Sequence, residues 1–310
     1  MTSSPSYTPA PASDFVLAFD LPKAGLRGRL VRLERTSAQA LSAHALPEEA
    51  ARIAGETLAM AALLGASLKL DGRLTVQTRS KGPLDLVTAD YFGAEVTEAG
   101  VKRAAGLRGF ARLDAERRAQ LGKTPSAGAL LGKGAMAITI EPRADGKTYQ
   151  GIVDLSPDGI AASGETYFAQ SEQLPTVLKL AAAPLFVAGN RAPQWRAGGM
   201  MLQVTPDGAR NEDDLERLTS HMRSLEDVEL VDASVSGEAI LWRLFHEDEV
   251  RVHTAEPLVF RCDCNGDRIA GVLKSYPEAD RAGLADPDGI IRAKCEFCGK
   301  VHEIATAALA

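Results

Sequence analysis

All four cysteines of this 310-residue chain lie in its last fifty residues, in two close pairs. The first pair is Cys262-x-Cys264 and the second is Cys295-x-x-Cys298, with thirty residues between the pairs. Four thiolates that converge on one point form a tetrahedral ligand set for Zn²⁺, with Zn–S distances of about 2.3 Å. Residues 261–304 are too few to bury much apolar surface. The sequence therefore predicts a small C-terminal domain that needs a metal ion to fold, with these four cysteines as ligands.

The residues around the second pair favour a zinc knuckle within a hairpin. Gly299 tolerates the tight backbone of a knuckle, and the short strands IIRAK (290–294) and KVHEI (300–304) flank it. DPDGI (286–290) is a turn signal, and the spacer has room for a helical insert at 267–284. His302 could replace a cysteine as ligand, but with four cysteines present we expect an exposed strand residue.

The same cysteines are suited to redox chemistry. Thiolates held by zinc are already deprotonated, so an oxidant that reaches them can react. Four cysteines allow three disulfide pairings. Bridges within each pair would close tiny loops and constrain the chain little, whereas a Cys262–Cys295 bridge would hold the halves of the domain together. Local pairing would remove a metal contribution of about 10–16 kcal/mol, the range for zinc-finger peptides, and unfold the domain. A purely structural zinc site is the alternative.

The chain before these cysteines has an α+β pattern. Residues 44–70 have apolar side chains at helical spacing, and residues 160–174 are a second helix candidate. Alternating runs without regular crossover helices predict a largely antiparallel sheet. These runs are 27–33, 73–79, 84–91, 135–142, 149–155, 184–189 and 200–206. We expect one mixed α/β-sheet domain over residues 15–207, preceded by a disordered tail at 1–14 that is rich in Pro, Ser and Ala.

An acidic segment joins the two regions. Residues 208–257 hold 13 acidic and 5 basic side chains, whereas the whole chain has a net charge of −6. Asn211 and Ser236 can each cap a helix. The expected apolar stripes are Leu215, Leu218, Met222 and Leu225, then Ile240, Leu241, Leu244 and Phe245. We predict an acidic helical linker over 208–260, either as a solvated hairpin or with its stripe packed loosely on the first domain, from which it can detach.

The cysteine spacing and four other stretches together resemble one known family. The stretches are LKLDGRLTVQTRSKGPLDLV (68–87), YFAQSEQLPT (167–176), GGMMLQVTP (198–206) and ILWRLFHEDEVRV (240–252), and the similarity covers residues 15–304. They resemble the 33 kDa chaperonins, redox-regulated holdases of the bacterial heat-shock response. YFAQSEQLPT has no chemistry that we can assign from its residues.

The resemblance implies a cytoplasmic, ATP-independent chaperone rather than an enzyme. Reduced Cys262, Cys264, Cys295 and Cys298 would bind one zinc ion, and the protein would be inactive. Oxidation would form Cys262–Cys264 and Cys295–Cys298 disulfides and release zinc. The linker would then loosen and expose apolar surface of the N-terminal domain to unfolded client proteins, and the active protein would be a homodimer.

Other functions are less well supported by the sequence. A thiol–disulfide oxidoreductase could use Cys295-x-x-Cys298, but the motif does not begin a helix, where the helix dipole would lower a thiol pKa. A nucleic-acid-binding zinc ribbon would need a basic surface, and residues 261–303 hold 7 basic and 8 acidic side chains. The Gly-Lys-Thr at 122–124 lacks the glycine that a phosphate-binding loop needs at position 117.

Membrane association and export are not expected either. No apolar run reaches 18 residues, and the N-terminus has neither a basic start nor an apolar core typical of a secretory signal. The two tryptophans, Trp195 and Trp242, are expected to be core or interface residues rather than client-binding ones.

Overall fold

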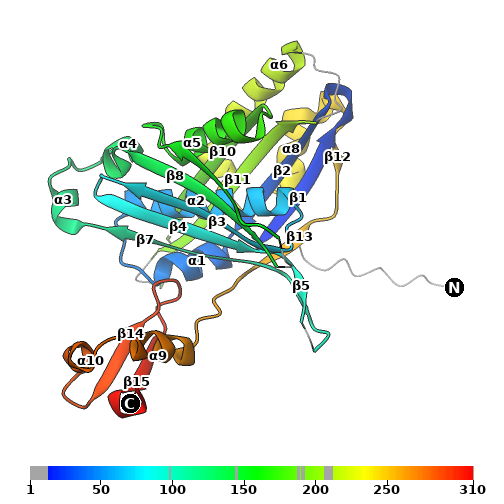
Figure 1. Cartoon of the computed structure of the whole chain (residues 1–310). Helices are drawn as coiled ribbons and strands as arrows, with labels where there is room; N and C mark the ends of the chain where they lie inside the picture. The colour runs from blue at the N-terminus through cyan, green and yellow to red at the C-terminus, as the bar shows by residue number, and fades with distance from the viewer. Residues whose placement is uncertain are drawn as a thin grey trace.

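The computed structural model describes residues 13–309, apart from 98, 144–145, 187–188, 190–192 and 206–211. Its main feature is one twisted sheet of eleven strands in the order β10-β11-β2-β1-β13-β7-β4-β3-β8-β9, with β12 paired to β1 (Figure 1). The strands are β1 (Phe15–Leu21), β2 (Leu26–Leu33), β3 (Gly72–Ser80), β4 (Leu84–Phe92), β7 (Ala105–Leu113), β8 (Gly134–Pro142), β9 (Tyr149–Asp154), β10 (Thr176–Leu185), β11 (Gln194–Val204), β12 (Arg251–Val252) and β13 (Glu256–Phe260). All pairs are antiparallel except β13 with β7, so the predicted α+β class is confirmed.

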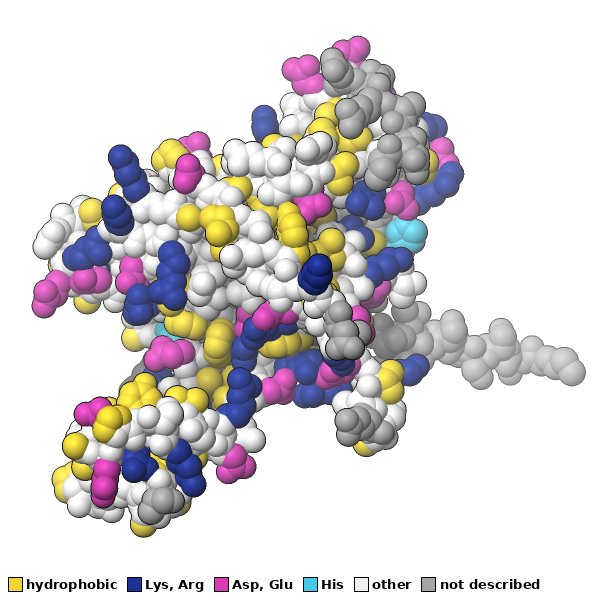
Figure 2. Space-filling view, in the orientation of Figure 1, with side chains coloured by type: hydrophobic (Ala, Val, Ile, Leu, Met, Phe, Trp, Pro, Cys, Tyr) yellow, Lys and Arg dark blue, Asp and Glu magenta, His cyan; other side chains and the backbone are white. Residues whose placement is uncertain are grey.

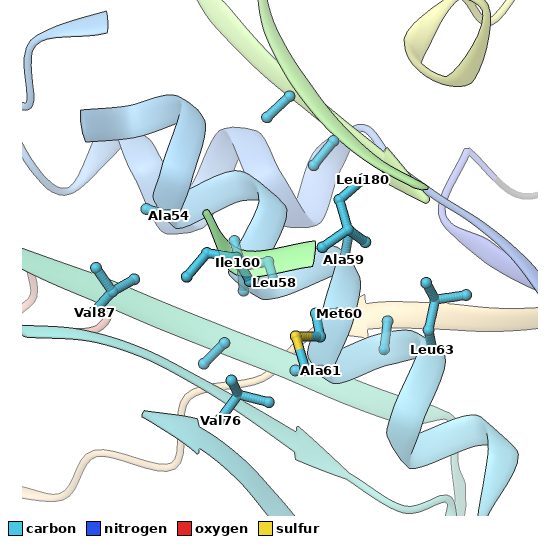
Figure 3. Close-up of a cluster of buried hydrophobic side chains, with 14 of the residues drawn as sticks. Ala54, Leu58, Ala59, Met60, Ala61, Leu63, Val76, Val87, Ile160 and Leu180 are labelled. Carbon is cyan, nitrogen blue, oxygen red and sulfur yellow. The ribbon is translucent and has the colours of Figure 1, made fainter. Parts of the chain in front are cut away.

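A long central helix fills one face of this sheet. Helix α2 (Glu48–Ser67) buries 14 of its 20 residues, and many of them are alanine, which lets the sheet approach closely. Figure 3 shows Leu58, Met60 and Leu63 of this helix among side chains from the surrounding strands. Gly65 is needed where the helix crosses β4, because a Cβ there would lie 2.1 Å from the Tyr91 ring. This packing is the main hydrophobic core.

Shorter helices complete the large domain. They are α1 (Arg35–Ser42), α3 (Ala115–Ala119), α4 (Ala127–Leu131) and α5 (Ile160–Tyr167), and a π-helical turn (Phe168–Glu172) continues α5. A small hairpin of β5 (Glu95–Val96) and β6 (Lys102–Arg103) extends from the sheet. Asp14, at the end of the expected tail, is buried and accepts the backbone N–H groups of Glu34, Arg35 and Thr36 at the start of α1. Residues 1–12 of that tail lie outside the described residues.

The linker helices cover a second hydrophobic cluster on the large domain. They are α6 (Glu212–Arg223), α7 (Asp227–Val231) and α8 (Gly237–Phe245). The predicted stripe residues Leu218, Met222, Leu241 and Phe245 are fully buried in this cluster, so the linker is packed rather than solvated. The predicted cap at Ser236 is present, because its hydroxyl accepts the N–H of Ala239. Asn211, the other expected cap, lies outside the described residues.

The linker and the sheet also share backbone structure. Strands β12 and β13, inside the segment predicted as linker, pair with β1, and β13 also pairs with β7. Buried Arg32 on β2 reaches the linker, where its guanidinium donates to the carbonyls of Leu230 and Glu229 at 3.1 and 2.9 Å. The alternating pattern of the sequence does not indicate that the predicted linker adds strands to the sheet, because pairing between strands far apart in the chain leaves no local signal.

The C-terminal module is a separate lobe below the large domain (Figure 1). It contains α9 (Gly266–Lys274), α10 (Glu278–Leu284) and the hairpin of β14 (Ile290–Lys294) and β15 (Val301–Ala305). Its hydrophobic cluster has only four buried side chains, Leu273, Ile291, Ile304 and Leu309. So small a core cannot by itself offset the conformational entropy of ordering the module.

Candidate metal and redox site

The four cysteine sulphurs lie together at one end of the module. All four Sγ atoms are within 4.8 Å of one another. Cys262 Sγ is 3.7 Å from Cys295 Sγ, and Cys264 Sγ is 3.5 Å from Cys298 Sγ. A tetrahedral Zn²⁺ site with Zn–S bonds of about 2.3 Å has S···S edges of about 3.8 Å. The donor set and its spacing therefore fit one zinc ion, and all four residues are free cysteines.

Local backbone structure turns the cysteines toward one point. In the second loop, the Cys295 N–H donates to the Lys300 carbonyl at 2.8 Å and the Gly299 N–H donates to the Cys295 carbonyl at 2.9 Å. Gly299 has φ +72°, the left-handed conformation that the predicted knuckle requires. In the first loop, the Asn265 side chain accepts the Asp267 N–H at 2.8 Å and caps α9 directly after Cys264.

The thiols differ in acidity when no ion neutralises them. Burial, together with hydrogen bonds from Cys298 and Cys262, raises the pKa of Cys264 to about 12. Burial also raises the pKa of Cys262. At Cys295 burial acts in the same direction, but the N–H groups of Cys298 and Phe297 outweigh it and lower the pKa. A divalent cation would reverse the effect of burial, because it stabilises thiolates directly.

His302 lies against the cluster, so the prediction of an exposed strand residue is wrong. Its side chain on β15 is only 8% exposed, and its Nε2 is 3.3 Å from Cys264 Sγ. The reason is strand alternation, since His302 and Ile304 lie on the same face of the hairpin and that face is covered by α9. The sequence placed His302 near the site but could not show which face of the strand it occupies.

Two residues next to the cysteines join the module to the large domain. Phe297, between Cys295 and Cys298, packs edge-on against Phe110 of β7, with ring centroids 5.0 Å apart. Arg261, which precedes Cys262, makes an ion pair of 2.7 Å with Glu95. Opposite charges lie side by side in this junction (Figure 2). Neither contact was predicted from the sequence. The only sequence signal for them was Phe297, an aromatic residue inside an otherwise polar knuckle.

Within the part of the chain that the structure describes, the other sequence signals do not form a second metal site. The Gly-Lys-Thr at 122–124 lies in the loop between α3 and α4, where Lys123 and Thr124 line a surface hollow beside α2. Trp195 is buried in the main core, as expected. Trp242 is 64% exposed on α8, so it is not a core residue. No helix among the described residues is long and apolar enough to cross a bilayer.

Comparison with known proteins gives a consistent assignment. The family model described as Hsp33 protein matches residues 14–305. A 33 kDa chaperonin of Caulobacter vibrioides is 37% identical over 299 residues, which is 94% of each chain. A 33 kDa chaperonin of Escherichia coli is 34% identical over 274 residues, covering 88% of this chain and 86% of its own.

A solved structure supports the fold independently. The crystal structure of the 33 kDa chaperonin from Thermotoga maritima superposes with a TM-score of 0.74 at 20% identity, covering 95% of this chain and 96% of that one. With a sheet domain, packed linker and four-cysteine module in one chain, and a family match over residues 14–305, the protein belongs to the Hsp33 family of chaperonins.

Proposed function

We propose that this chaperone is a redox-regulated, ATP-independent holdase whose switch is the four-cysteine cluster. The observation that carries the proposal is the contrast between four converging thiols and the four-residue apolar core of their module. A module with so small a core depends on whatever holds its two cysteine loops together. Chemistry at the sulphurs would therefore control the folding of the module.

Cys262, Cys264, Cys295 and Cys298 are the proposed metal ligands in the reduced state. When bound, Zn²⁺ would keep the four thiols ionised and cross-link the two loops. The residues themselves supply the geometry: Gly299 provides the tight turn of the second loop, and Asn265 fixes the exit from the first. In this state the linker helices remain packed, and the protein is inactive.

Oxidation would convert the ligands into two local disulfides, Cys262–Cys264 and Cys295–Cys298. Each pair loses two electrons and forms one S–S bond, while one peroxide takes up the electrons and two protons to give two water molecules. The sulphurs then lose the negative charge that holds a cation. This pairing is taken from the family resemblance and not from the S···S contacts, because the distances of 3.7 and 3.5 Å join sulphurs of opposite loops. Local bridges close small loops and would stabilise the module little.

Loss of the module would loosen the linker through the strand that joins them. β13 ends at Phe260, directly before the first cysteine loop, and it is held between β1 and β7. Once the folded module no longer anchors β13, the helices α6, α7 and α8 are held in place by their contacts to the second hydrophobic cluster. Release of these helices would uncover Leu30, Met200, Leu202 and their neighbours, a surface suited to unfolded client proteins.

The remaining assignments complete the proposal. The proposed location is the cytoplasm, a reducing compartment. The proposed active form is a homodimer that binds client proteins without nucleotide. We assign no enzymatic role to Cys295-x-x-Cys298, because the motif lies in the turn between β14 and β15 rather than at a helix N-terminus. Nucleic acid and membranes are not proposed partners.

The test is to treat zinc-loaded protein with peroxide and mild heat, then measure released zinc, free thiols and the aggregation of an unfolding client. We expect one zinc per chain to be released and aggregation to be suppressed without ATP. Reduced protein is the matched control and should not protect the client. If zinc is released and the client aggregates as before, the holdase assignment is wrong.

A further inference from the structure

The junction between module and sheet contains a strip of alternating rings and charge. Phe92 on β4 and Arg108 and Phe110 on β7 lie on the sheet face opposite α2, and we call these three residues the aromatic–arginine strip. Their neighbours along β7, Leu107 and Ala111, point into the main core. The strip is therefore on the outer face of the sheet, where Phe297 of the module covers it and His44 of the large domain lies beside Phe110, with ring centroids 6.2 Å apart.

Arg108 is the rigid centre of the strip. Its guanidinium makes an ion pair of 2.7 Å with Asp90, which is 3% exposed. The other oxygen of Asp90 accepts the Thr75 hydroxyl at 2.6 Å. Asp90 and Arg108 are directly paired across β4 and β7, and both the Nε and a terminal nitrogen of Arg108 contact the same Asp90 oxygen, which holds the guanidinium in place. A fixed guanidinium is pre-organised to bind an aromatic ring on its open face.

Phe297 of the module occupies that open face. The Arg108 guanidinium carbon is 3.9 Å from the centroid of the Phe297 ring and 5.1 Å from that of Phe92. Phe110 meets Phe297 at 90°, the edge-to-face arrangement that aromatic pairs favour. One exposed loop thus places a single aromatic side chain into a site built from a cation and two rings.

A second contact fixes the other cysteine loop to the same strip. Arg261 lies with its guanidinium carbon 5.0 Å from the Phe92 ring, and its side chain runs close over Gly106. A Cβ on Gly106 would lie 2.6 Å from the Cβ of Arg261, so only glycine leaves room for this approach. The residue before Cys262 and a residue between Cys295 and Cys298 therefore both dock on the strip.

We propose that Phe297 is an internal pseudo-ligand and that the strip it covers binds an aromatic side chain of an unfolded client after oxidation. The inference deepens the proposed function by naming one client contact and what blocks it in the reduced state. Unfolded proteins expose Phe, Tyr and Trp side chains that native proteins bury. A site that already holds Phe297 has the chemistry to hold such a ring.

Oxidation supplies the displacement. A Cys295–Cys298 disulfide brings the two sulphurs to about 2.05 Å, so the knuckle that carries Phe297 must change shape. In that step the two thiolates lose two electrons, and one peroxide takes up these electrons together with two protons from the solvent to give two water molecules. The strip itself contains no cysteine and belongs to the large domain, so it stays folded while its internal ligand leaves.

The experiment uses an unfolded client that carries p-benzoylphenylalanine, a photo-crosslinking analogue of Phe, and the full-length zinc-loaded chain. Crosslinks are mapped by peptide in the reduced and the oxidised protein. The variant Phe297→Ala removes the pseudo-ligand and leaves the four thiols in place. Val272→Ala, an exposed residue on α9 of the same module, is the matched control. Zinc content is measured for both variants.

We expect reduced Phe297→Ala to crosslink at residues 84–92 and 105–113 several-fold more than reduced wild type or Val272→Ala. Oxidised wild type should crosslink at the same residues, and Phe110→Ala should lower that yield several-fold. This second variant tests the strip even if Phe297→Ala loses zinc. If oxidised wild type suppresses client aggregation but crosslinks elsewhere, or if Phe110→Ala changes nothing, the strip is not a client site. If oxidised wild type does not suppress aggregation at all, the proposed function fails instead.

Discussion

The large domain and the C-terminal module are stabilised in opposite ways. The large domain surrounds α2 with a continuous core in which Leu58, Met60 and Leu63 are almost completely buried. The module has four buried apolar side chains and four converging thiols. The stability of the large domain depends on many small contacts that no single chemical event removes. In the second, stability rests on one site, so chemistry at that site can act as a switch.

The largest expected effect is the loss of the module on metal removal. A chelator under reducing conditions should unfold residues 261–304, because the metal contribution in zinc-finger peptides is about 10–16 kcal/mol. Cys264→Ser should weaken zinc binding and loosen the module in the same way. The measurements are zinc affinity and the protease sensitivity of the module. An unchanged zinc affinity in the variant would show that Cys264 is not a ligand.

The next largest effect is expected where the linker meets the large domain. Phe245 is fully buried against Phe19, with ring centroids 5.7 Å apart. Phe245→Ala should destabilise the packing of α8 by about 3–5 kcal/mol, because it leaves a cavity in the second cluster. Binding of a hydrophobic dye to reduced, zinc-loaded protein measures the surface uncovered. Dye binding equal to that of wild type would mean that the linker does not cover the surface as described.

A smaller effect should depend on pH. Burial and nearby Asp227 raise the pKa of Glu56 on α2 to about 7. The folded carboxyl therefore holds its proton above the unfolded pKa, so stability falls as pH rises from about 4.5 to about 7. The cost above this range is at most about 3 kcal/mol. Glu56→Gln should stabilise the large domain at pH 8 more than at pH 5, measured by denaturant midpoints. Equal shifts at both pH values would contradict this assignment.

The smallest effect is expected on the outer side of the linker. Trp242 is exposed on α8 and packs on His246, with ring centroids 5.5 Å apart. Trp242→Ala should change stability by less than about 0.5 kcal/mol, as is usual for surface positions. The denaturation curve of Trp242→Ala, compared with that of Phe245→Ala, tests whether the buried side of the linker contributes most of the linker's stability. A loss of similar size in both variants would remove that distinction.

The sequence predicted best where one local pattern determines the structure. The helical spacing of residues 44–70 corresponds to α2, and the cysteine spacing predicted four sulphurs that the structure brings within 4.8 Å. Ser236 caps its helix because capping depends on neighbouring residues alone. The α+β class followed from alternating runs without crossover helices.

The sequence predicted less where distant segments decide the structure. Strands β1, β7 and β10 were not predicted, and among the described residues of the run 184–189 only the first two belong to a strand, at the end of β10. β10 contains the run Ala181, Ala182 and Ala183, so its alternation is weak. The burial of His302 and the packing of Phe297 against Phe110 depend on tertiary structure. Strand β13 joins the sheet because β1 and β7 leave a place for it between them.

Hydrogen exchange of the oxidised, metal-free chain against the reduced, zinc-loaded chain tests the central claim most directly. Amides of β14, β15 and α9 should lose their protection, followed by those of α6 and α8, while amides of α2 and β3 keep theirs. Protection retained throughout β14, β15 and α9 after oxidation would show that the module does not depend on its thiols, and the proposed switch would be contradicted.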